Sequence, residues 1–366
     1  MKSQFSLRKA GSALAVVAAL SLSACQAPGK QAQTPAQPTV AASQPDKQQV
    51  QQRELAEGLY EMVYSRATRA LWVASALDFK RDIGGAIYRL DAATLQTRSV
   101  IHSDLKNFGM TSDPAGEFLY ITNSLDGGIS KVDAQSGKVV SRLLFKEKNA
   151  QGYPFGTREI IWHDGKLYIG GVGEPGVIWV VDAQTMKLKT RIKNAGKWVT
   201  GLLWSSFNDR LYAANGGGEI LVINPHSNRI EARWKPEGEQ PALLLNLAED
   251  PASGRLFVTD SSRAKTTLVI DERSGKVIKR LGVGDSLGIK FNAKRNEIYI
   301  SQRESGKVLQ LDATSYAVKN SWSFPTHPNS LLLSADSQTL FVTLKQGFNK
   351  DHSSKGVDSV VRISLN

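Results

Sequence analysis

The chain is poor in cysteine: it contains one, Cys25, among 366 residues. A single cysteine excludes an intrachain disulfide framework, a CxxC redox pair, a cysteine-held iron–sulfur cluster and a CxxCH haem attachment site. Histidine is also scarce, since the chain has five and they fall at different places along it. Because a zinc site needs several ligands that converge, we expect neither a metal nor a cofactor.

A long apolar run is missing from the N-terminus as well. The run from Ala13 to Leu22 is too short to cross a bilayer as a helix. It follows a basic stretch and ends in Leu22-Ser23-Ala24-Cys25, which is the pattern of a lipoprotein signal peptide. We therefore expect residues 1–24 to be removed and Cys25 to be lipidated. By resemblance to enterobacterial lipoproteins, Gln26 favours a periplasmic location on the inner leaflet of the outer membrane.

Residues 25–50 have no apolar period and are rich in Gln, Ala and Pro. Such a composition cannot repay the entropy of ordering by burial, so we expect a disordered tether. Acidic residues are outnumbered over the whole chain, with 34 Asp and Glu against 46 Lys and Arg, and the net charge is +12. A basic surplus favours phosphate-bearing or other anionic partners.

What the chain has in abundance is a repeat. An aliphatic-aromatic-aliphatic triplet recurs seven times at intervals of 42 to 48 residues, as Leu71-Trp72-Val73, Leu119-Tyr120-Ile121, Leu167-Tyr168-Ile169, Leu211-Tyr212-Ala213, Leu256-Phe257-Val258, Ile298-Tyr299-Ile300 and Leu340-Phe341-Val342. No helical period lies between the triplets. About 45 residues per unit match one four-stranded propeller blade. The sequence predicts an all-β, seven-bladed β-propeller over residues 51–366.

The ends of this region predict how the ring closes. The seventh repeat has a final strand near Val360–Leu365 and then no further strand. We expect the N-terminal segment, beginning at Gln51, to pair with it and complete the last blade. Most repeats also place an Asp or Asn before a turn, and we expect these side chains to form Asx-turns: Asp91, Asp133, Asp182, Asn224, Asp271 and Asp312.

Two of these patterns resemble the YVTN family of β-propellers. Leu119-Tyr120-Ile121-Thr122-Asn123 and the turn from Val132 to Lys138 are close to the family's repeat consensus. Further segments, among them Gly58–Met62 and Pro325–Leu331, resemble an enterobacterial periplasmic member in the same order. The resemblance covers residues 55–366 and implies a seven-bladed propeller that can bind single-stranded DNA. The cysteine and tether at the front depart from that member.

The residues themselves also suggest a polyanion-binding face. In a propeller, the loops after the triplets share one face with the connections that enter the inner strands, and there cations and aromatics alternate. Phosphates need cations and unstacked bases need flat rings, so this composition favours single-stranded nucleic acid. The candidate contacts are Lys80, Arg81, Lys106, Phe108, Phe155, Arg158, Lys197, Trp198, Arg263, Arg303, His327 and Lys345, with Lys350 and Lys355 on the same face. The alternative for each lysine is ordinary solvated surface.

Two other classes of function remain open. A rigid ring with variable loops can act as a scaffold for envelope proteins. A lactonase-like or sugar-handling enzyme would use charges at the channel mouth, where Arg158-Glu159 is expected, and would need converging carboxylates with perturbed pKa values. Gly284-Asp285-Ser286-Leu287-Gly288 matches a hydrolase pattern, but it lies between strands rather than at a strand-to-helix turn. We therefore expect a binding protein and not an enzyme.

Overall fold

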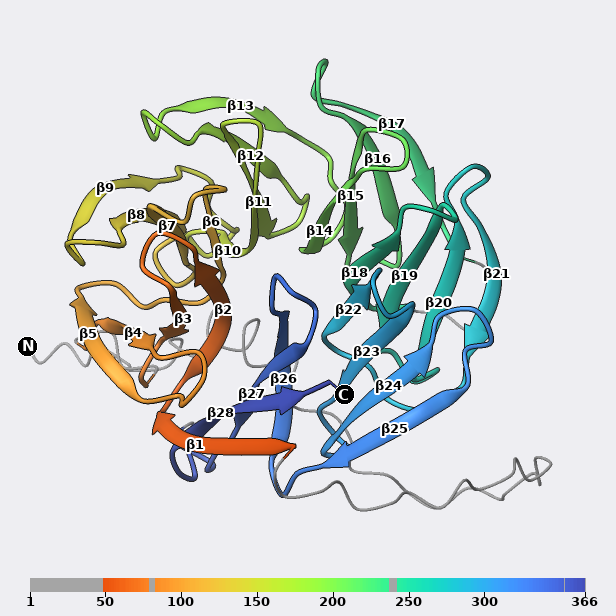
Figure 1. The fold of residues 1–366 in the computed structure, drawn as a ribbon. Coiled ribbons are helices and arrows are strands. Elements are labelled where there is room, and N and C mark those ends of the chain that lie inside the picture. The colour runs from red at the N-terminus through yellow and green to blue at the C-terminus, as the bar shows by residue number, and fades with distance from the viewer. Residues whose placement is uncertain (1–48, 79–82, 237–241, 352, 366) are drawn as a thin grey trace, which may run out of the picture.

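The protein is a ring of seven four-stranded antiparallel sheets (Figure 1). The computed structural model describes residues 49–78, 83–236, 242–351 and 353–365. Within these ranges the chain forms strands and turns without a helix. The described residues accordingly include no helix long and apolar enough to cross a membrane. The prediction of an all-β, seven-bladed propeller is confirmed.

Each blade runs outward from the axis in four strands. The innermost strands are β2 (Leu59–Ser65), β6 (Met110–Ser112), β10 (Gly156–His163), β14 (Val199–Ser205), β18 (Leu244–Asp250), β22 (Ile289–Asn292) and β26 (His327–Leu333). The second strands carry the triplets and are β3 (Ala70–Ser75), β7 (Phe118–Asn123), β11 (Lys166–Val172), β15 (Arg210–Asn215), β19 (Arg255–Asp260), β23 (Glu297–Gln302) and β27 (Thr339–Lys345). The third strands are β4 (Gly85–Leu90), β8 (Gly128–Asp133), β12 (Ile178–Asp182), β16 (Ile220–Asn224), β20 (Thr266–Asp271), β24 (Lys307–Asp312) and β28 (Asp358–Ser364). The outermost are β5 (Thr97–Ser103), β9 (Val139–Leu144), β13 (Leu188–Ile192), β17 (Arg229–Trp234), β21 (Lys276–Leu281), β25 (Val318–Ser323) and, in blade seven, β1 (Val50–Ala56).

The two ends of the chain meet in blade seven. Strand β1 pairs antiparallel with β28, from Val50 opposite Ile363 to Ala56 opposite Asp358. The expected closure is confirmed, with one strand of the N-terminal segment completing blade seven while the next, β2, starts blade one (Figure 1). The ring thus has no open end at which a blade would expose its apolar face.

The triplets supply the contacts between blades. Their central aromatic residues are all at most 2% exposed: Trp72, Tyr120, Tyr168, Tyr212, Phe257, Tyr299 and Phe341. Tyr120 of blade two, for example, packs with Ile160 and Trp179 of blade three. Its hydroxyl donates a hydrogen bond of 3.1 Å to the carbonyl of Ala183 in that blade. The aromatic area that repeats along the sequence is therefore the area that holds neighbouring blades together.

The recurring acidic residues hold turns, as the sequence predicts. Asp133 Oδ1 accepts a hydrogen bond of 2.7 Å from the backbone N–H of Ser136, and Asp312 Oδ1 does the same with Ser315. Gly137 follows with φ of 71°, a conformation that glycine adopts without strain. These carboxylates are part of the fold and lie away from the axis.

Candidate functional site

The loops of the ring fall on two faces. One face, called the loop face here, carries the connections from each outermost strand to the next innermost strand and the loops between second and third strands. The opposite face, the turn face, carries the tight turns between first and second and between third and fourth strands. Because Val50 pairs with Ile363 at the end of β28, the described chain enters the ring at the turn face.

Two of the predicted cations are buried and serve the fold. The ammonium group of Lys106 is 3.1 Å from both the carbonyl of Ala76 and a carboxylate oxygen of Asp78, and the residue is 3% exposed. Lys345 is 2% exposed and donates to the carbonyl of Leu59 and to Asp358. The expectation that these lysines contact a ligand on the loop face is corrected: both satisfy buried oxygens where blades join.

Two of the predicted aromatic contacts are corrected in the same way. Phe108 is 5% exposed, and its ring centroid lies 4.7 Å from that of Tyr60 in the preceding blade. Phe155 belongs to the apolar cluster that contains Trp179. Neither ring offers a free face to a nucleobase, because each closes a gap between two blades.

Lys197 and Trp198 remain available to a ligand. Both are half-buried, and the Lys197 ammonium lies 4.5 Å from the centroid of the Trp198 ring. Trp198 has φ of 52°, and its N–H donates to the carbonyl of Gly173 in the preceding blade. Its carbonyl accepts from the N–H of Gly216, so the backbone holds this pair at a defined place on the loop face.

The other predicted residues divide between surface and axis. Arg263 is exposed, while Arg303 and His327 are half-buried and joined by a contact of 2.8 Å between the Arg303 carbonyl and His327 Nδ1. Burial lowers the pKa of Arg303. Arg158 lines the axis of the ring. Lys80, Arg81 and Cys25 lie outside the described residues.

The loop face also carries cations that the sequence analysis missed. Exposed lysines without an ion pair among the described residues are Lys146, Lys148 and Lys193, in addition to the expected Lys350 and Lys355. Several acidic side chains on this face are already paired, as Glu147 is with Arg191 and Glu304 with Lys265. These two carboxylates are therefore not available to the exposed lysines.

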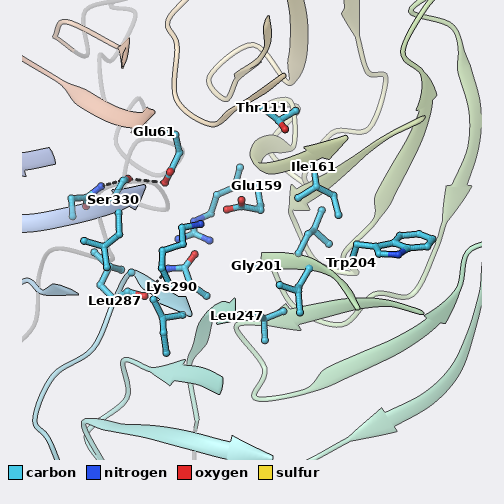
Figure 2. A pocket seen from close by; sticks show the side chains of 18 of the residues that line it. Glu61, Thr111, Glu159, Ile161, Gly201, Trp204, Leu247, Leu287, Lys290 and Ser330 are labelled. Carbon is cyan, nitrogen blue, oxygen red and sulfur yellow. Dashed lines mark hydrogen bonds between the residues drawn. The ribbon is translucent and has the colours of Figure 1, made fainter. Parts of the chain in front are cut away.

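A cavity of about 360 Å³ lies on the axis, and all seven innermost strands contribute to its lining (Figure 2). Five of these strands shift register against the second strand of their blade near their N-terminal ends. Examples are the shifts between Leu59 and Met62 and between Thr157 and Ile160. Such irregularities turn a side chain out of the sheet. In four of these strands the skipped residues include one that lines the cavity, namely Glu61, Glu159, Asn246 or Ser330.

These four residues and a glycine from each of the other three blades occupy equivalent places, called the ring position here. Each lies directly before the residue that pairs with the third member of the triplet. In blade order they are Glu61, Gly109, Glu159, Gly201, Asn246, Gly288 and Ser330. Polar side chains and glycines alternate. A Cβ atom on Gly201 would lie 2.1 Å from the carbonyl oxygen of Leu245 in the next blade, so glycine is required there.

Charges of both signs face the cavity. Ser330 donates a hydrogen bond of 2.7 Å to Glu61, whereas the carboxylate of Glu159 has no hydrogen bond or ion pair in the described part of the chain. Burial and the nearby Glu61 raise the pKa of Glu159 to about 7, against the opposing effects of Arg158 and Lys290. Burial also lowers the pKa of Arg158, whose Nη1 is enclosed without a hydrogen-bond partner.

One side of the cavity is apolar. Ile161, Leu203, Trp162 and Trp204 from blades three and four line it. The ring of Trp204 stacks on His163, with centroids 3.3 Å apart, and packs against the apolar cluster between blades three and four. The Arg158-Glu159 pair thus lies at the axis, as the sequence predicts, whereas Glu61 and Lys290 were not among the predicted residues.

Within the part of the chain that the structure describes, there is neither a cluster of metal ligands nor a free hydroxyl at Ser286. Within the described residues no three His, Cys, Asp or Glu side chains gather to hold a metal ion. Ser286 is 2% exposed and donates a hydrogen bond of 3.0 Å to the carbonyl of Thr266, so its hydroxyl stabilises a connection between strands.

Comparison with known proteins yields both close relatives and a distant structural match. The proteins named "Uncharacterized protein YncE" from Salmonella typhimurium LT2 and Escherichia coli K12 are each 39% identical over 319 residues, which is 86% of this chain and 90% of theirs. Antigen Lp49 of Leptospira interrogans is 24% identical over 60% of this chain and 49% of its own length. The β-propeller domain of Myceliophteria thermophila Cps50 (Swd1) shares the fold, with a TM-score of 0.63 at 11% identity over 86% of this chain and all of that one. No protein-family model matches the chain.

Proposed function

Because the chain belongs to the YncE family of β-propellers, we propose that it is an exported binding protein whose loop face holds single-stranded DNA or a similar extended polyanion. The observation that carries this proposal is a set of cations without an ion pair on the loop face, with the half-exposed Trp198 among them. The cations are Lys146, Lys148, Lys193, Lys197, Arg263, Lys350 and Lys355.

The chemistry of these residues suits a phosphate backbone. Each phosphate carries one negative charge, and a cation that neutralises it releases a condensed counterion, which makes binding favourable at low salt. These cations lie in the connections that enter blades three and four and in loops of blades five and seven. A strand that follows the loop face therefore meets a cation at four of the seven blades, while the acidic Glu147 and Glu304 are neutralised by their own partners.

Trp198 is the residue that favours a single strand over a duplex. Its backbone is held by hydrogen bonds to Gly173 and Gly216, and its side chain is half-buried. One unstacked base can lie on such a ring, and base stacking on an aromatic side chain contributes about 1 to 3 kcal/mol. A duplex keeps its base faces covered and gains only the phosphate contacts. Phe108 and Phe155 are buried, so of the three aromatic residues predicted to contact a ligand only Trp198 is available for stacking.

A fluorescent oligothymidine and a duplex of equal length, titrated with the residue 26–366 fragment at several salt concentrations, test this proposal. We expect the single strand to bind more tightly, with an affinity that falls as salt rises. Trp198→Ala should weaken single-strand binding about 5- to 150-fold, which corresponds to about 1 to 3 kcal/mol. Lys187→Met, on an exposed lysine of the turn face, serves as the matched control and should change little. Affinity that does not depend on salt, or no binding at low salt, rules the proposal out.

We also propose that lipidation of Cys25 anchors the protein to the inner leaflet of the outer membrane. The described chain enters the ring at the turn face, through Gln49 and β1. An anchor attached there leaves the loop face accessible to a ligand in the periplasm. Membrane fractionation of the native chain should find it with the outer membrane, and Cys25→Ala should release it. Gln26→Asp should move the protein to the inner membrane. A native chain found free of membranes would overturn the anchoring without affecting the loop face.

A further inference from the structure

The axial cavity brings together four charged side chains, none of which forms an ion pair with another described residue. Glu61 and Glu159 come from blades one and three, Arg158 from blade three and Lys290 from blade six. Figure 2 shows Glu61, Glu159 and Lys290 around the same space. No ion pair joins the two acids to the two bases in the described residues. The loop-face proposal uses none of these carboxylates.

Such an arrangement is costly unless something enters the cavity. A charge withdrawn from water needs a partner and hydrogen bonds to repay its desolvation. Glu159 has no hydrogen-bond partner, and Arg158 Nη1 is enclosed without one. The neighbouring Asn246 and Ser330 are already engaged with Leu287 and Glu61. The cavity therefore lacks a positive group to pair with the carboxylates and a negative group to pair with the two bases.

We propose that the axial cavity binds a small zwitterion, namely an amino acid or short peptide. Its ammonium group lies at Glu61 and Glu159, and its carboxylate lies at Arg158 and Lys290. An ammonium group carries three donors for the carboxylate oxygens, and a guanidinium beside a lysine is suited to a carboxylate.

The wall of the cavity is consistent with an apolar side chain on the ligand. Ile161 and Leu203 present aliphatic surface next to the charged groups, and Trp162 and Trp204 lie beside them. The volume, about 360 Å³, is at the small end of ligand pockets, which range from about 300 to 1,000 Å³. A nucleic acid chain is excluded, because two carboxylates at the ring position repel phosphate.

The electrostatics of Glu159 support the same ligand. Burial and the proximity of Glu61 raise its pKa to about 7, so two ionised carboxylates at this place repel each other. A cation bound between them relieves this repulsion, as an opposite charge favours the ionised form of an acid. A neutral sugar would not reduce the repulsion between the two carboxylates.

Isothermal titration calorimetry at pH 7.5 with L-leucine and L-alanyl-L-leucine tests the proposal. Fluorescence of Trp162 and Trp204 offers a second readout. Two blocked probes separate the charges: N-acetyl-L-leucine lacks the ammonium group, and L-leucinamide lacks the carboxylate. We expect at least one zwitterion to bind, and its blocked forms to bind at least tenfold more weakly.

Variants assign each end of the ligand. Glu159→Gln should weaken binding of the zwitterion at least tenfold and leave binding of N-acetyl-L-leucine unchanged. Lys290→Met should weaken binding of the zwitterion at least tenfold and leave binding of L-leucinamide unchanged. Glu117→Gln and Lys187→Met, on exposed residues of the turn face, are the matched controls. Circular dichroism checks that each variant folds, and Glu61→Gln replaces Glu159→Gln if the latter does not.

Three results overturn the proposal. The first is that neither zwitterion binds at concentrations up to about 10 mM, so that any binding free energy is weaker than about −3 kcal/mol. The others are equal binding of the zwitterion and its blocked forms, and binding that the cavity variants do not change. Oligonucleotide binding measured on the same variants keeps the two sites distinguishable. It should persist in Glu159→Gln, since that residue does not lie on the loop face.

Discussion

Replacing Glu272 with glutamine should stabilise the protein above neutral pH. Glu272 follows β20 in blade five, is 3% exposed and lies 2.8 Å from the hydroxyl of Ser205 in blade four. The same hydroxyl contacts the carboxylate of Glu249. A hydroxyl has one proton to donate, so both contacts are hydrogen bonds only if one of the two acids carries a proton. The backbone N–H groups of Ser206 and Phe207 donate to Glu249 and favour its ionised form, which leaves the proton on Glu272. The junction of blades four and five therefore favours a neutral acid.

The magnitude follows from the pKa. Burial, with the nearby charge of Glu249, raises the pKa of Glu272 from 4.5 to about 7. Each tenfold change in an acid dissociation constant corresponds to about 1.4 kcal/mol, so the full effect is about 3 kcal/mol. The folded state prefers the protonated acid more than the unfolded state does. Its stabilisation is thus complete well below pH 4.5, is lost between pH 4.5 and 7, and stays lost above that range.

Glutamine is neutral at every pH and can donate its amide hydrogen to Ser205. Urea denaturation followed by tryptophan fluorescence should show Glu272→Gln about 2 to 3 kcal/mol more stable than the wild type at pH 8. The difference should shrink to less than about 1 kcal/mol at pH 5. Glu117→Gln, on an exposed glutamate, controls for the loss of a surface charge. Equal stability of Glu272→Gln and wild type at pH 8 would refute the reasoning.

Three further predictions concern the ring itself. Deleting β1 (Val50–Ala56) should lower the melting temperature of the whole ring in circular dichroism, since blade seven loses its fourth strand; an unchanged melting curve contradicts this closure. Lys345→Met should cost about 3 to 5 kcal/mol in urea denaturation, because it leaves the buried Asp358 without its cation. Gly201→Ala should cost about 1 to 3 kcal/mol, while Gly282→Ala, which meets no atom within 4 Å, should cost less.

The fold was predictable because its signal repeats. Each triplet, such as Leu119-Tyr120-Ile121, places an aromatic ring where one blade meets the next, and the ring must be large and apolar in all seven blades. Asx-turns such as that of Asp133 recur for the same reason. A requirement imposed seven times by the same geometry appears seven times in the sequence.

The exposure of single loop residues was not predictable in this way. Lys106 and Lys345 look like surface lysines in sequence, yet each reaches a backbone carbonyl that the junction of two blades leaves without a donor. Which carbonyl is left unpaired depends on the local path of the loop, and no repeat encodes it. Phe108 and Phe155 are buried for a similar reason, since they fill gaps specific to their own junctions.

The axial residues can be identified from the sequence when the seven repeats are aligned with one another. The ring position alternates between polar residues and glycine because a Cβ on the glycine of one blade would collide with a carbonyl of the next, as at Gly201 and Gly288. Glu61 and Glu159 are therefore identifiable as axial from their place before the inner strand. Their proximity to Lys290, which lies two residues beyond Gly288, comes only from the closed ring.

Because the number of blades is odd, residues of the same kind must be neighbours at one junction of the ring position. Alternation of large and small residues around a ring of seven must fail once, because seven is odd. It fails between blades seven and one, where Ser330 and Glu61 are neighbours and share a hydrogen bond of 2.7 Å. Blade seven is also the blade in which the two ends of the chain pair, and its Asp358 accepts the N–H of Leu59 in blade one. The Glu61 carboxylate of the cavity is thus held by the blade that closes the ring, so the shape of the site depends on closure.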